Sequence, residues 1–421
     1  MNPASKKPAL TPKLRFPEFR GAKGWSAVPG DKLFDQISNR DAPAGLPILA
    51  ITQEHGAIPR EDIDYHVSVT DKSVETYKEV LPGDFIISLR SFQGGIEYSE
   101  YHGICSPAYV ILRKRTELVD LFYRIFFKSH QFIQQLTKNL EGLRDGKMIS
   151  YNQFSELLLP EPTRPEQHKI ATCLSSLDDL IGAEGRKLDA LKAHKKGLMQ
   201  QLFPREDESV PRLRFPEFRD AGEWNKTPTR EIADVLQGYG FPERFQGKRE
   251  GQYPVYKVRD ISRTHDAGSR YIDEAAHYID HQTLKVLRAK TLPAGTTIFA
   301  KIGEALRLNK RVITTKPCVV DNNVAGVKAI KGKATDLFLY YLWSTISLAD
   351  YSGGVVPAVN KSKIEALLVT HPPMDEQDRI ATGLSLLDDL IAAQSYKLFE
   401  LKIHKQWLMQ QLFPSIEEAH V

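Results

Sequence analysis

The stretch that decides the fold is Glu166–Pro204, which reads EQHKIATCLSSLDDLIGAEGRKLDALKAHKKGLMQQLFP and recurs as Glu376–Pro414, EQDRIATGLSLLDDLIAAQSYKLFELKIHKQWLMQQLFP. Of these 39 aligned positions, 26 are identical. A shorter string is also repeated, since Pro12–Arg20 reads PKLRFPEFR and Pro211–Arg219 reads PRLRFPEFR. The stretches between the repeated blocks share far less. A duplication that keeps its connectors and lets its bodies diverge indicates one scaffold that presents two different recognition domains.

Apolar residues recur in both long blocks at steps of three, four or seven, as in the heptad repeat of a coiled-coil seam. Two heptad positions in each block are polar instead: Glu184 and Lys195 in the first, Gln394 and Lys405 in the second. Such polar positions set the register of a coiled coil at some cost in stability. The predicted seam residues are Ile170, Leu174, Leu177, Ile181, Leu188, Leu191, Leu198, Leu202, Ile380, Leu384, Leu387, Ile391, Leu398, Leu401, Leu408 and Leu412.

Two matching amphipathic helices in one chain are expected to pack on each other. The first carries the chain away from the first body and the second begins at the second body, so the pair should run antiparallel about a pseudo-twofold axis. Each helix would be about 55 Å long at 1.5 Å per residue. The alternative is that each helix packs only on its own body.

The sequence therefore predicts an α/β (α+β) fold, in which two recognition domains are joined by two long helices that form an antiparallel coiled coil, with a pseudo-twofold internal repeat. The predicted divisions are an N-terminal lead-in at 1–24, a first body at 25–164, a helical spacer at 165–204, a linker with the repeated LRFPEF string at 205–223, a second body at 224–374, a second helical spacer at 375–414 and a tail at 415–421.

Each body mixes strand-like and helical segments in the same order. The predicted strands are 47–52, 84–88 and 109–112 in the first body and 254–258, 296–300 and 324–327 in the second. A helix is expected at 120–136 and again at 336–348, and both segments open with Asp-Leu-Phe. His277 and His281 are four residues apart on a predicted helix, which is more typical of an exposed pair than of a metal site.

Composition limits the classes of function. The chain has 421 residues, 41% of them hydrophobic and 26% charged, and its 57 basic residues almost cancel 53 acidic ones, for a net charge of +4. A nucleic-acid surface would therefore have to be local. The three cysteines form no CxxC pair, which favours a reducing compartment. With no signal-peptide core and no apolar run of membrane-spanning length, the sequence predicts a cytoplasmic protein that does not enter a membrane.

Candidate DNA-contacting residues lie in the segments that differ between the two bodies. Arg, Lys, Asn and Gln side chains can reach base edges in a major groove, and Lys and Arg also hold phosphates. A single loop Arg or Lys is more often simply solvated, so the predicted interface rests on clusters. The candidates are Arg90, Gln93, Arg144, Lys147, Tyr151, Asn152, Lys257, Arg259, Arg263, Lys301, Arg307, Asn309, Lys310, Arg311, Asn360, Lys361 and Lys363.

Catalytic motifs are missing from the sequence. Gly247-Lys248 lacks the upstream glycine and the following Ser/Thr of a Walker A motif, and Gly238-Tyr239-Gly240 lacks the third glycine of a dinucleotide site. No Asn/Asp-Pro-Pro-aromatic string of the kind that amino-methyltransferases use occurs. The sequence therefore predicts no catalytic residue, no metal ligand and no cofactor site in this chain.

Three repeated motifs resemble the specificity (S) subunit of type I restriction–modification systems. They are the LRFPEF lead-ins, Glu166-Gln167 with Glu376-Gln377, and the Leu-Met-Gln-Gln-Leu-Phe-Pro endings at 198–204 and 408–414. The resemblance covers essentially the whole chain. It implies that each body is a target-recognition domain for one half of a split sequence in double-stranded DNA. It also implies that the helices dock two methyltransferase (M) subunits, which motor-nuclease (R) subunits join. S-adenosylmethionine, ATP and Mg²⁺ are then expected in the partner subunits.

Two other classes of function stay open from the sequence. One is a coiled-coil scaffold whose two bodies bind proteins. The other is a self-contained nuclease or methyltransferase, which the missing motifs disfavour. The recognised bases cannot be derived from the residues.

Overall fold

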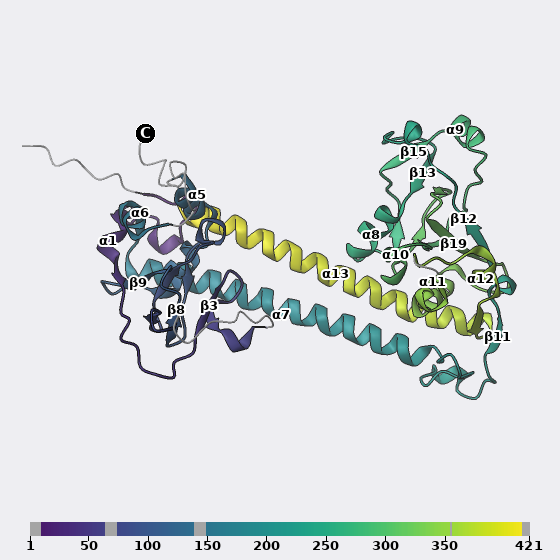
Figure 1. Cartoon of the computed structure of the whole chain (residues 1–421), viewed down its shortest axis with the longest axis horizontal. Helices are drawn as coiled ribbons and strands as arrows, with labels where there is room; N and C mark the ends of the chain where they lie inside the picture. The colour runs from purple at the N-terminus through teal and green to yellow at the C-terminus, as the bar shows by residue number, and fades with distance from the viewer. Residues whose placement is uncertain (1–9, 64–73, 139–148, 354–355, 415–421) are drawn as a thin grey trace, which may run out of the picture. The chain divides into compact units, whose positions relative to one another are not determined.

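The computed structural model describes residues 10–63, 74–138, 149–353 and 356–414. The chain forms two compact units, Met1–Ala183 with Leu398–Val421, and Glu184–Lys397. The two longest helices, α7 (Arg164–Leu202) and α13 (Met374–Leu412), each contribute residues to both units (Figure 1). Each unit therefore contains one body, the start of one long helix and the end of the other.

The first body is built on an antiparallel sheet with strand order β2-β9-β6-β7. Phe34, Phe85 and Phe127 form an aromatic cluster between this sheet and the helices, with ring centroids 5.5 Å apart for Phe34–Phe85 and 5.2 Å apart for Phe85–Phe127. The strands are β2 (Phe34–Ile37), β3 (Leu49–Thr52), β4 (Gly56–Pro59), β5 (Lys78–Val80), β6 (Phe85–Ile87), β7 (Glu97–Tyr98), β8 (Gly103–Cys105) and β9 (Val110–Lys114), and the helices are α1 (Gly30–Leu33), α3 (Ser91–Gly94), α4 (Asp120–Phe126), α5 (His130–Lys138) and α6 (Tyr151–Glu156).

The second body has a larger sheet of order β12-β19-β16-β17-β14 and a three-stranded sheet of order β15-β13-β18. Helix α11 packs on the larger sheet, where Trp343 stacks on Phe299 with ring centroids 5.3 Å apart. The strands are β12 (Ala233–Gln237), β13 (Tyr253–Tyr256), β14 (Tyr271–Ile272), β15 (His277–Ile279), β16 (Thr297–Ala300), β17 (Arg311–Thr314), β18 (Val319–Val320) and β19 (Val324–Ala329), and the helices are α8 (Val258–Asp266), α9 (His281–Val286), α10 (Glu304–Arg307), α11 (Asp336–Thr345) and α12 (Lys361–Ala366).

The first and last strands of each body form an equivalent antiparallel pair. In the first, β1 (Ser26–Pro29) pairs antiparallel with β10 (Leu158–Glu161), and in the second, β11 (Asn225–Pro228) pairs antiparallel with β20 (Leu368–His371). The last strand of each pair leads directly into a long helix. The predicted α/β fold with an internal repeat is confirmed at this level.

The predicted strands are found with shifted ends, and one of the strand predictions runs too far. Residues 254–258 were expected to be extended, but β13 stops at Tyr256 and Val258 begins α8. The start of α8 is fixed because Asp260 accepts the backbone N–H of Lys257 at 2.9 Å, which is a local cap that competes with strand continuation.

Three helix predictions also need correction. Residues 120–136 form two helices, α4 and α5, because the chain turns at Ser129, whose Oγ accepts the N–H of Phe132 at 3.3 Å. Residues 336–348 are helical only to Thr345, and a separate 3₁₀ turn follows at Leu348–Tyr351. His277 and His281 share no helix, since His277 lies in β15 and His281 begins α9.

The two long helices pack antiparallel on each other within each unit. In the second unit, Glu184 of α7 contacts Gln394 of α13, and further along α7 Lys195 pairs with Asp388. In the first unit, Lys405 of α13 pairs with Asp178 at 2.5 Å. Every predicted seam residue is buried or half-buried. The alternative in which each helix packs only on its own body is wrong.

The polar seam positions make specific contacts. Gln394 Nε2 donates to Glu184 Oε2 at 2.5 Å and to the Glu184 carbonyl at 3.0 Å. Lys195 and Lys405 do not contact each other: Lys195 binds Asp388 at 2.5 Å, as Lys405 binds Asp178. The two lysine pairs are equivalent positions of the repeat, so each unit holds the same cross-helix ion pair.

The ends of the seam extend into the cores of the bodies. Ile170 and Leu174 of α7 are buried with Leu412 of α13 in the core of the first unit, while Ile380 and Leu384 of α13 are buried with Leu202 of α7 in that of the second. The seam is therefore a coiled-coil strip in the middle of each helix and an ordinary core face at its ends. Among the described residues, every helix is either too short or too polar to span a bilayer.

The repeated LRFPEF and Glu-Gln motifs bind each other in each unit. Arg15 donates from Nε to Glu166 Oε1 at 2.6 Å and from Nη2 to Oε2 at 2.7 Å. Arg214 makes the same two bonds to Glu376, both at 2.7 Å. All four side chains are under 10% exposed. Paired, charge-assisted bonds of this geometry fix both position and orientation.

The glutamine beside each glutamate secures the body. Gln167 Oε1 accepts the N–H of Val119 at 3.1 Å, and Gln377 Oε1 accepts the N–H of Thr335 at 3.2 Å. Val119 and Thr335 are the residues that precede α4 and α11. Each long helix is thus joined at its first turn to the main helix of its own body.

The repeated Leu-Phe-Pro endings complete the same junction from the other helix. In the first unit, Phe413, which directly follows α13, packs on Phe122 with ring centroids 5.5 Å apart, and the Leu14 N–H donates to the Gln411 carbonyl at 3.0 Å. In the second unit, Phe203 takes the equivalent place against Phe338, at 5.7 Å. The three repeated motifs therefore come together once in each unit, at a contact region that we call the junction.

Removing Arg214 should destabilise the second unit. Arg214→Ala is expected to lower the free energy of unfolding by about 3 to 5 kcal/mol, because the Glu376 carboxylate would stay buried without its cation. Urea unfolding followed by circular dichroism measures the change. Arg219→Ala removes an exposed arginine of the same string and should cost less than about 0.5 kcal/mol. Equal losses in the two variants would contradict the role assigned to Arg214.

Candidate nucleic-acid interface

The first body offers two neighbouring predicted contacts at α3. Arg90 immediately precedes this short helix and Gln93 lies within it, and both side chains are exposed. The Arg90 carbonyl accepts a hydrogen bond from Gln53 Nε2 at 3.3 Å, which ties the turn to the β3–β4 hairpin. The predicted residues Arg144 and Lys147 lie outside the described residues.

Tyr151 and Asn152 form the first turn of α6, and they differ in exposure. The Tyr151 ring is half-buried and its hydroxyl donates to the Phe34 carbonyl at 3.0 Å, so this side chain serves the core. Asn152 is exposed and its side chain is free to contact a ligand. Of this predicted pair, the structure leaves Asn152 as the accessible member.

The equivalent turn in the second body is the start of α12. Asn360 caps this helix, since its Oδ1 accepts the N–H of Lys363 at 2.9 Å. Lys361 is exposed and lies 3.4 Å from Glu365, and Lys363 Nζ donates to the Tyr351 carbonyl at 3.4 Å. Asn360 is therefore explained by helix capping, while Lys361 and Lys363 place two ammonium groups at the surface.

Three candidates belong to the start and middle of α8. Lys257 Nζ donates to Gln246 Oε1 at 2.7 Å and is half-buried. Arg259 and Arg263 are exposed on the helix. Helix α8 thus presents two exposed arginines, of which Arg263 lies 3.7 Å from Asp260.

The run 307–311 is not a single surface cluster. Arg307 is exposed, with Glu304 3.8 Å away. Asn309 adopts a left-handed backbone conformation with φ of 52°, and its Nδ2 donates to the Ser344 carbonyl at 3.3 Å. Lys310 pairs with Asp266, the last residue of α8, at 2.6 Å. This pair joins the run to α8.

Arg311 is a core residue and not a surface contact. It is 2% exposed, its guanidinium lies 4.8 Å from the centre of the Phe299 ring, and its Nη2 donates to Asn309 Oδ1 at 2.6 Å. Burial lowers the pKa of Arg311 to about 9, which still leaves it protonated at neutral pH. Arg311 begins β17, a strand that is buried at all four positions, which the sequence run of basic residues does not reveal.

Lys301 lies near a buried carboxylate. Asp321 is 8% exposed, and burial raises its pKa while the charges of Lys257 and Lys301 lower it. Burial also lowers the pKa of Lys301 itself. The structure therefore brings Lys257 and Lys301 together around Asp321, although they are far apart in sequence.

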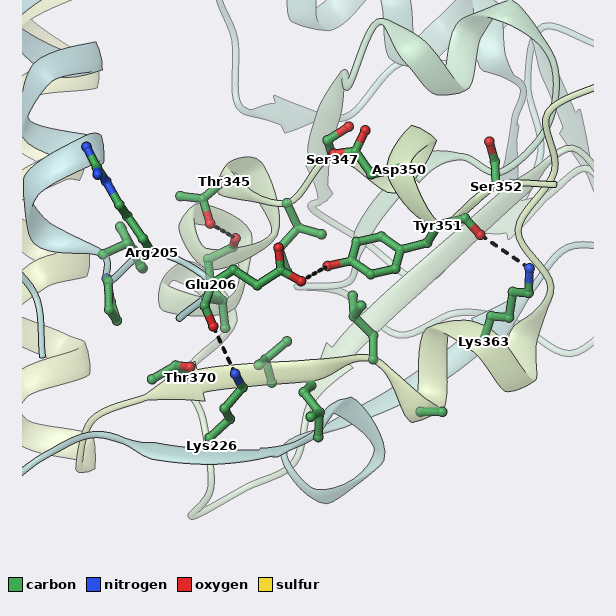
Figure 2. Close-up of a pocket in the computed structure, with 18 residues that line it drawn as sticks. Arg205, Glu206, Lys226, Thr345, Ser347, Asp350, Tyr351, Ser352, Lys363 and Thr370 are labelled. Atoms are coloured by element: carbon green, nitrogen blue, oxygen red, sulfur yellow. Dashed lines mark hydrogen bonds between the residues drawn. The ribbon is translucent and has the colours of Figure 1, made fainter. Parts of the chain in front are cut away.

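A groove of about 830 Å³ lies beside α12 in the second unit, and Figure 2 shows its lining. Tyr351 donates from its hydroxyl to Glu206 at 3.2 Å, and Lys226 Nζ donates to the Glu206 carbonyl at 2.8 Å. Lys363 is the only predicted candidate that lines this groove. The lining combines the basic residues Arg205, Lys226 and Lys363 with the acidic residues Glu206 and Asp350, so this groove is of mixed charge.

A second groove in the same unit, of about 970 Å³, is formed by residues that are not among the predicted DNA contacts. We refer to it as the basic groove. It lies between the end of α7, the segment that follows it, α8 and α11. Its charged and titratable lining residues are Lys192, Lys195, Lys196, Arg205, Arg212 and His265. Within the described ranges, no group of three or more His, Cys, Asp or Glu side chains is placed to hold a metal ion.

Comparison with known proteins shows what the chain is similar to. Residues 221–402 match the family model described as the type I restriction modification DNA specificity domain. The second body and most of α13 fall within this match, so the predicted resemblance to type I specificity subunits is confirmed.

Relatives align along most of the chain. The putative type I restriction enzyme MjaX specificity subunit of Methanocaldococcus jannaschii is 22% identical over 387 residues, covering 87% of this chain and 86% of its own. The MjaVIII specificity subunit of the same organism is 22% identical, covering 87% and 88%.

Solved structures share the fold. A chain from a type I R-M system has a TM-score of 0.59 at 16% identity, covering 93% of this chain and 98% of that one. The type I S subunit from M. genitalium has a TM-score of 0.54 at 16% identity, covering 96% and 99%. The predicted fold class, with two domains and two long helices, is therefore confirmed.

Substitution of two arginines in the run 307–311 should affect the stability of the protein to different extents. Arg311→Met is expected to lower the free energy of unfolding by about 2 to 4 kcal/mol, because the buried hydrogen bonds of Arg311 are lost. Arg307→Met, at an exposed site, should change it by less than about 0.5 kcal/mol. Urea unfolding of the two variants measures both values, and an unchanged stability for Arg311→Met would contradict its assignment to the core.

Proposed function

We propose that this chain is the DNA-recognition subunit of a type I restriction–modification complex, and that each body reads one half of a split target. The observation that carries the proposal is that two bodies of one architecture are joined to their helices by the same junction, while their exposed polar segments differ. Phosphate and base contacts of different kinds would then be presented on one scaffold. The chain itself supplies recognition and no catalytic group.

The accessible candidates support double-stranded DNA as the ligand. Arg90 and Gln93 in the first body, and Arg259, Arg263 and Arg307 in the second, are exposed side chains of the types that contact base edges and phosphates. The two sets share no sequence pattern. The two half-sites should therefore differ, which gives an asymmetric target and not a palindrome.

The predicted domain limits, 25–164 and 224–374, are kept as the two target-recognition domains in this proposal. Helices of 39 residues are about 58 Å long. We expect each recognition domain to read DNA inboard of its helix end, so that half-sites of three to five base pairs would lie about one turn of DNA apart, 10 base pairs between centres. An unread gap of roughly five to eight base pairs would follow.

Docking of methyltransferase subunits is proposed for the long helices. In the first unit, Phe399, Ile403 and Trp407 of α13 are 57%, 44% and 49% exposed and recur at steps of four. Apolar side chains that line one face of a helix in this way are typical of protein contacts. The partners proposed are two methyltransferase subunits, with motor-nuclease subunits joining through the complex.

The repeat of the docking surface is imperfect. At the positions of α7 equivalent to Phe399, Ile403 and Trp407, the chain has Asp189, Ala193 and Gly197. Much of the identity between the two blocks is also explained by the internal junction. Lys397, the position equivalent to Lys187, binds Glu184 at 2.5 Å and is therefore engaged within the chain. The apolar face of α13 is therefore the sharper place to test docking.

Cofactors in this proposal belong to the partners: S-adenosylmethionine with the methyltransferase subunits, and ATP and Mg²⁺ with the motor-nuclease subunits. The proposed compartment is the cytoplasm, where the DNA and these partners are found. A protein-binding scaffold is the alternative, and it shares the docking surface but not the DNA target.

Exchange of one body should change one half of the target. Replacing residues 25–164 with the first body of another specificity subunit is expected to change one half-site, because the second body and both junctions are untouched. Sequencing of methylated positions in cells that carry the matching methyltransferase measures this. The matched control replaces residues 224–374 and should change the other half alone. Loss or change of both halves in either hybrid would contradict the proposal.

Changes on the exposed face of α13 should weaken docking without unfolding the chain. Phe399→Asp with Trp407→Ser is expected to reduce the number of methyltransferase subunits in the complex, because two large apolar contacts are lost. Light scattering of the purified complex gives its mass. Lys402→Ser, an exposed change on the same helix, is the control. An unchanged mass in the double variant would show that this face does not dock the partner.

A further inference from the structure

The basic groove concentrates positive charge beside the end of α7, a helix whose sequence is largely repeated in α13. Lys192, Lys195 and Lys196 share one face of α7, since they are separated by three and four residues. The segment after α7 adds Arg205 and Arg212, and α8 adds His265. In the described part of the chain, the lining contains no Asp or Glu. The groove is therefore a local exception to the nearly neutral composition of the protein.

Three of these cations are not neutralised internally. Lys195 binds Asp388 at 2.5 Å and Arg212 binds Glu208 at 3.2 Å. His265 lies 3.6 Å from Asp266. The side chains of the remaining three, Lys192, Lys196 and Arg205, form no ion pair or hydrogen bond with any described residue, and all three are exposed.

Arg205 is directed away from the neighbouring groove. Figure 2 shows its guanidinium pointing away from Glu206 and Tyr351, which hydrogen bond to each other. Arg205 lines both grooves, but only the basic groove lacks acidic groups. The two grooves of the second unit thus differ in charge, since one is lined by both acidic and basic residues and the other by basic residues without acidic ones.

The rest of the lining suits phosphate oxygens. Gln200 and Gln201 add amide groups that can donate hydrogen bonds, whereas the hydroxyls of Ser344 and Thr345 donate to carbonyls of α11. Side chains of these types, with Lys and Arg, make most contacts to the DNA backbone. His265 lies near the end of α8, the helix that carries the exposed Arg259 and Arg263. The groove is therefore continuous with the element proposed to face DNA.

We propose that the basic groove binds the phosphodiester backbone of duplex DNA, with Lys192, Lys196 and Arg205 as the phosphate contacts. This inference rests on the proposed DNA-recognition function and adds to it a contact by a spacer helix, outside the divergent loops. Contacts to phosphate position a protein on DNA but carry no sequence information. The groove should therefore strengthen binding to every duplex equally. The equivalent residue of Lys196 in the second block is Gln406, so the first block contributes more to this binding.

The test compares two double variants of the full-length chain with the wild type on a labelled random-sequence duplex of about 40 base pairs. Lys192→Gln with Lys196→Gln removes two groove cations. Arg186→Gln with Lys187→Gln removes two exposed charges of the same helix outside the groove. Fluorescence anisotropy across a salt series gives the affinity and its salt dependence. Circular dichroism melting checks that all three proteins are folded to the same extent.

The groove variant should bind at least about tenfold more weakly at 0.1 M salt, with the slope of log K against log salt reduced by about two. The slope for the control variant should differ from that of the wild type by less than about 0.5, which corresponds to about half of one phosphate contact. On the selected target, once known, the groove variant should lose the same factor in affinity as on random duplex.

An unchanged slope with wild-type binding intact would overturn the groove assignment and leave the proposed function standing. Unchanged DNA binding with a lower complex mass beside methyltransferase subunits would instead assign the groove to a protein partner. Failure of the wild type, alone and with methyltransferase subunits, to bind any duplex would reject the proposed function together with the groove.

Discussion

The paired hydrogen bonds between arginine and glutamate at each junction are the constraint on which the rest of the structure depends. Arg15 with Glu166 and Arg214 with Glu376 hold each lead-in segment against the first turn of a long helix. The burial of these pairs requires both partners, because either charge alone would be left in a site with little water. This explains why two short motifs, about 150 residues apart in the chain, are retained together in both halves.

The junction also separates what is fixed from what varies. Gln167 and Gln377 join each helix to its body through backbone groups, and Phe413 and Phe203 bring the other helix into the same core. None of these contacts involves the exposed segments of the bodies. A body can therefore change its loops without disturbing its attachment, which is the physical condition for two different recognition domains on one scaffold.

The sequence predicted the fold better than the interface. Heptad spacing identified both long helices and their partners, because a coiled-coil seam depends on local periodicity. The side-chain roles depend on contacts that are distant in sequence: Arg311 is buried under Phe299, and Asn360 caps a helix, although both looked like surface contacts. The basic groove could not be predicted from the sequence because its residues come from α7, the segment after it, α8 and α11. The spacing of Lys192, Lys195 and Lys196 is the one local signal, and the heptad pattern assigns Lys195 to a polar position of the coiled-coil seam.

Selection of bound fragments from a random duplex library, using the full chain with its methyltransferase subunits, tests the central claim most directly. The account predicts two short conserved blocks of different sequence, separated by a gap of constant length with no base preference. A single continuous block, or two blocks related as a palindrome, would contradict it, because the two bodies would then not act as separate and unlike recognition domains.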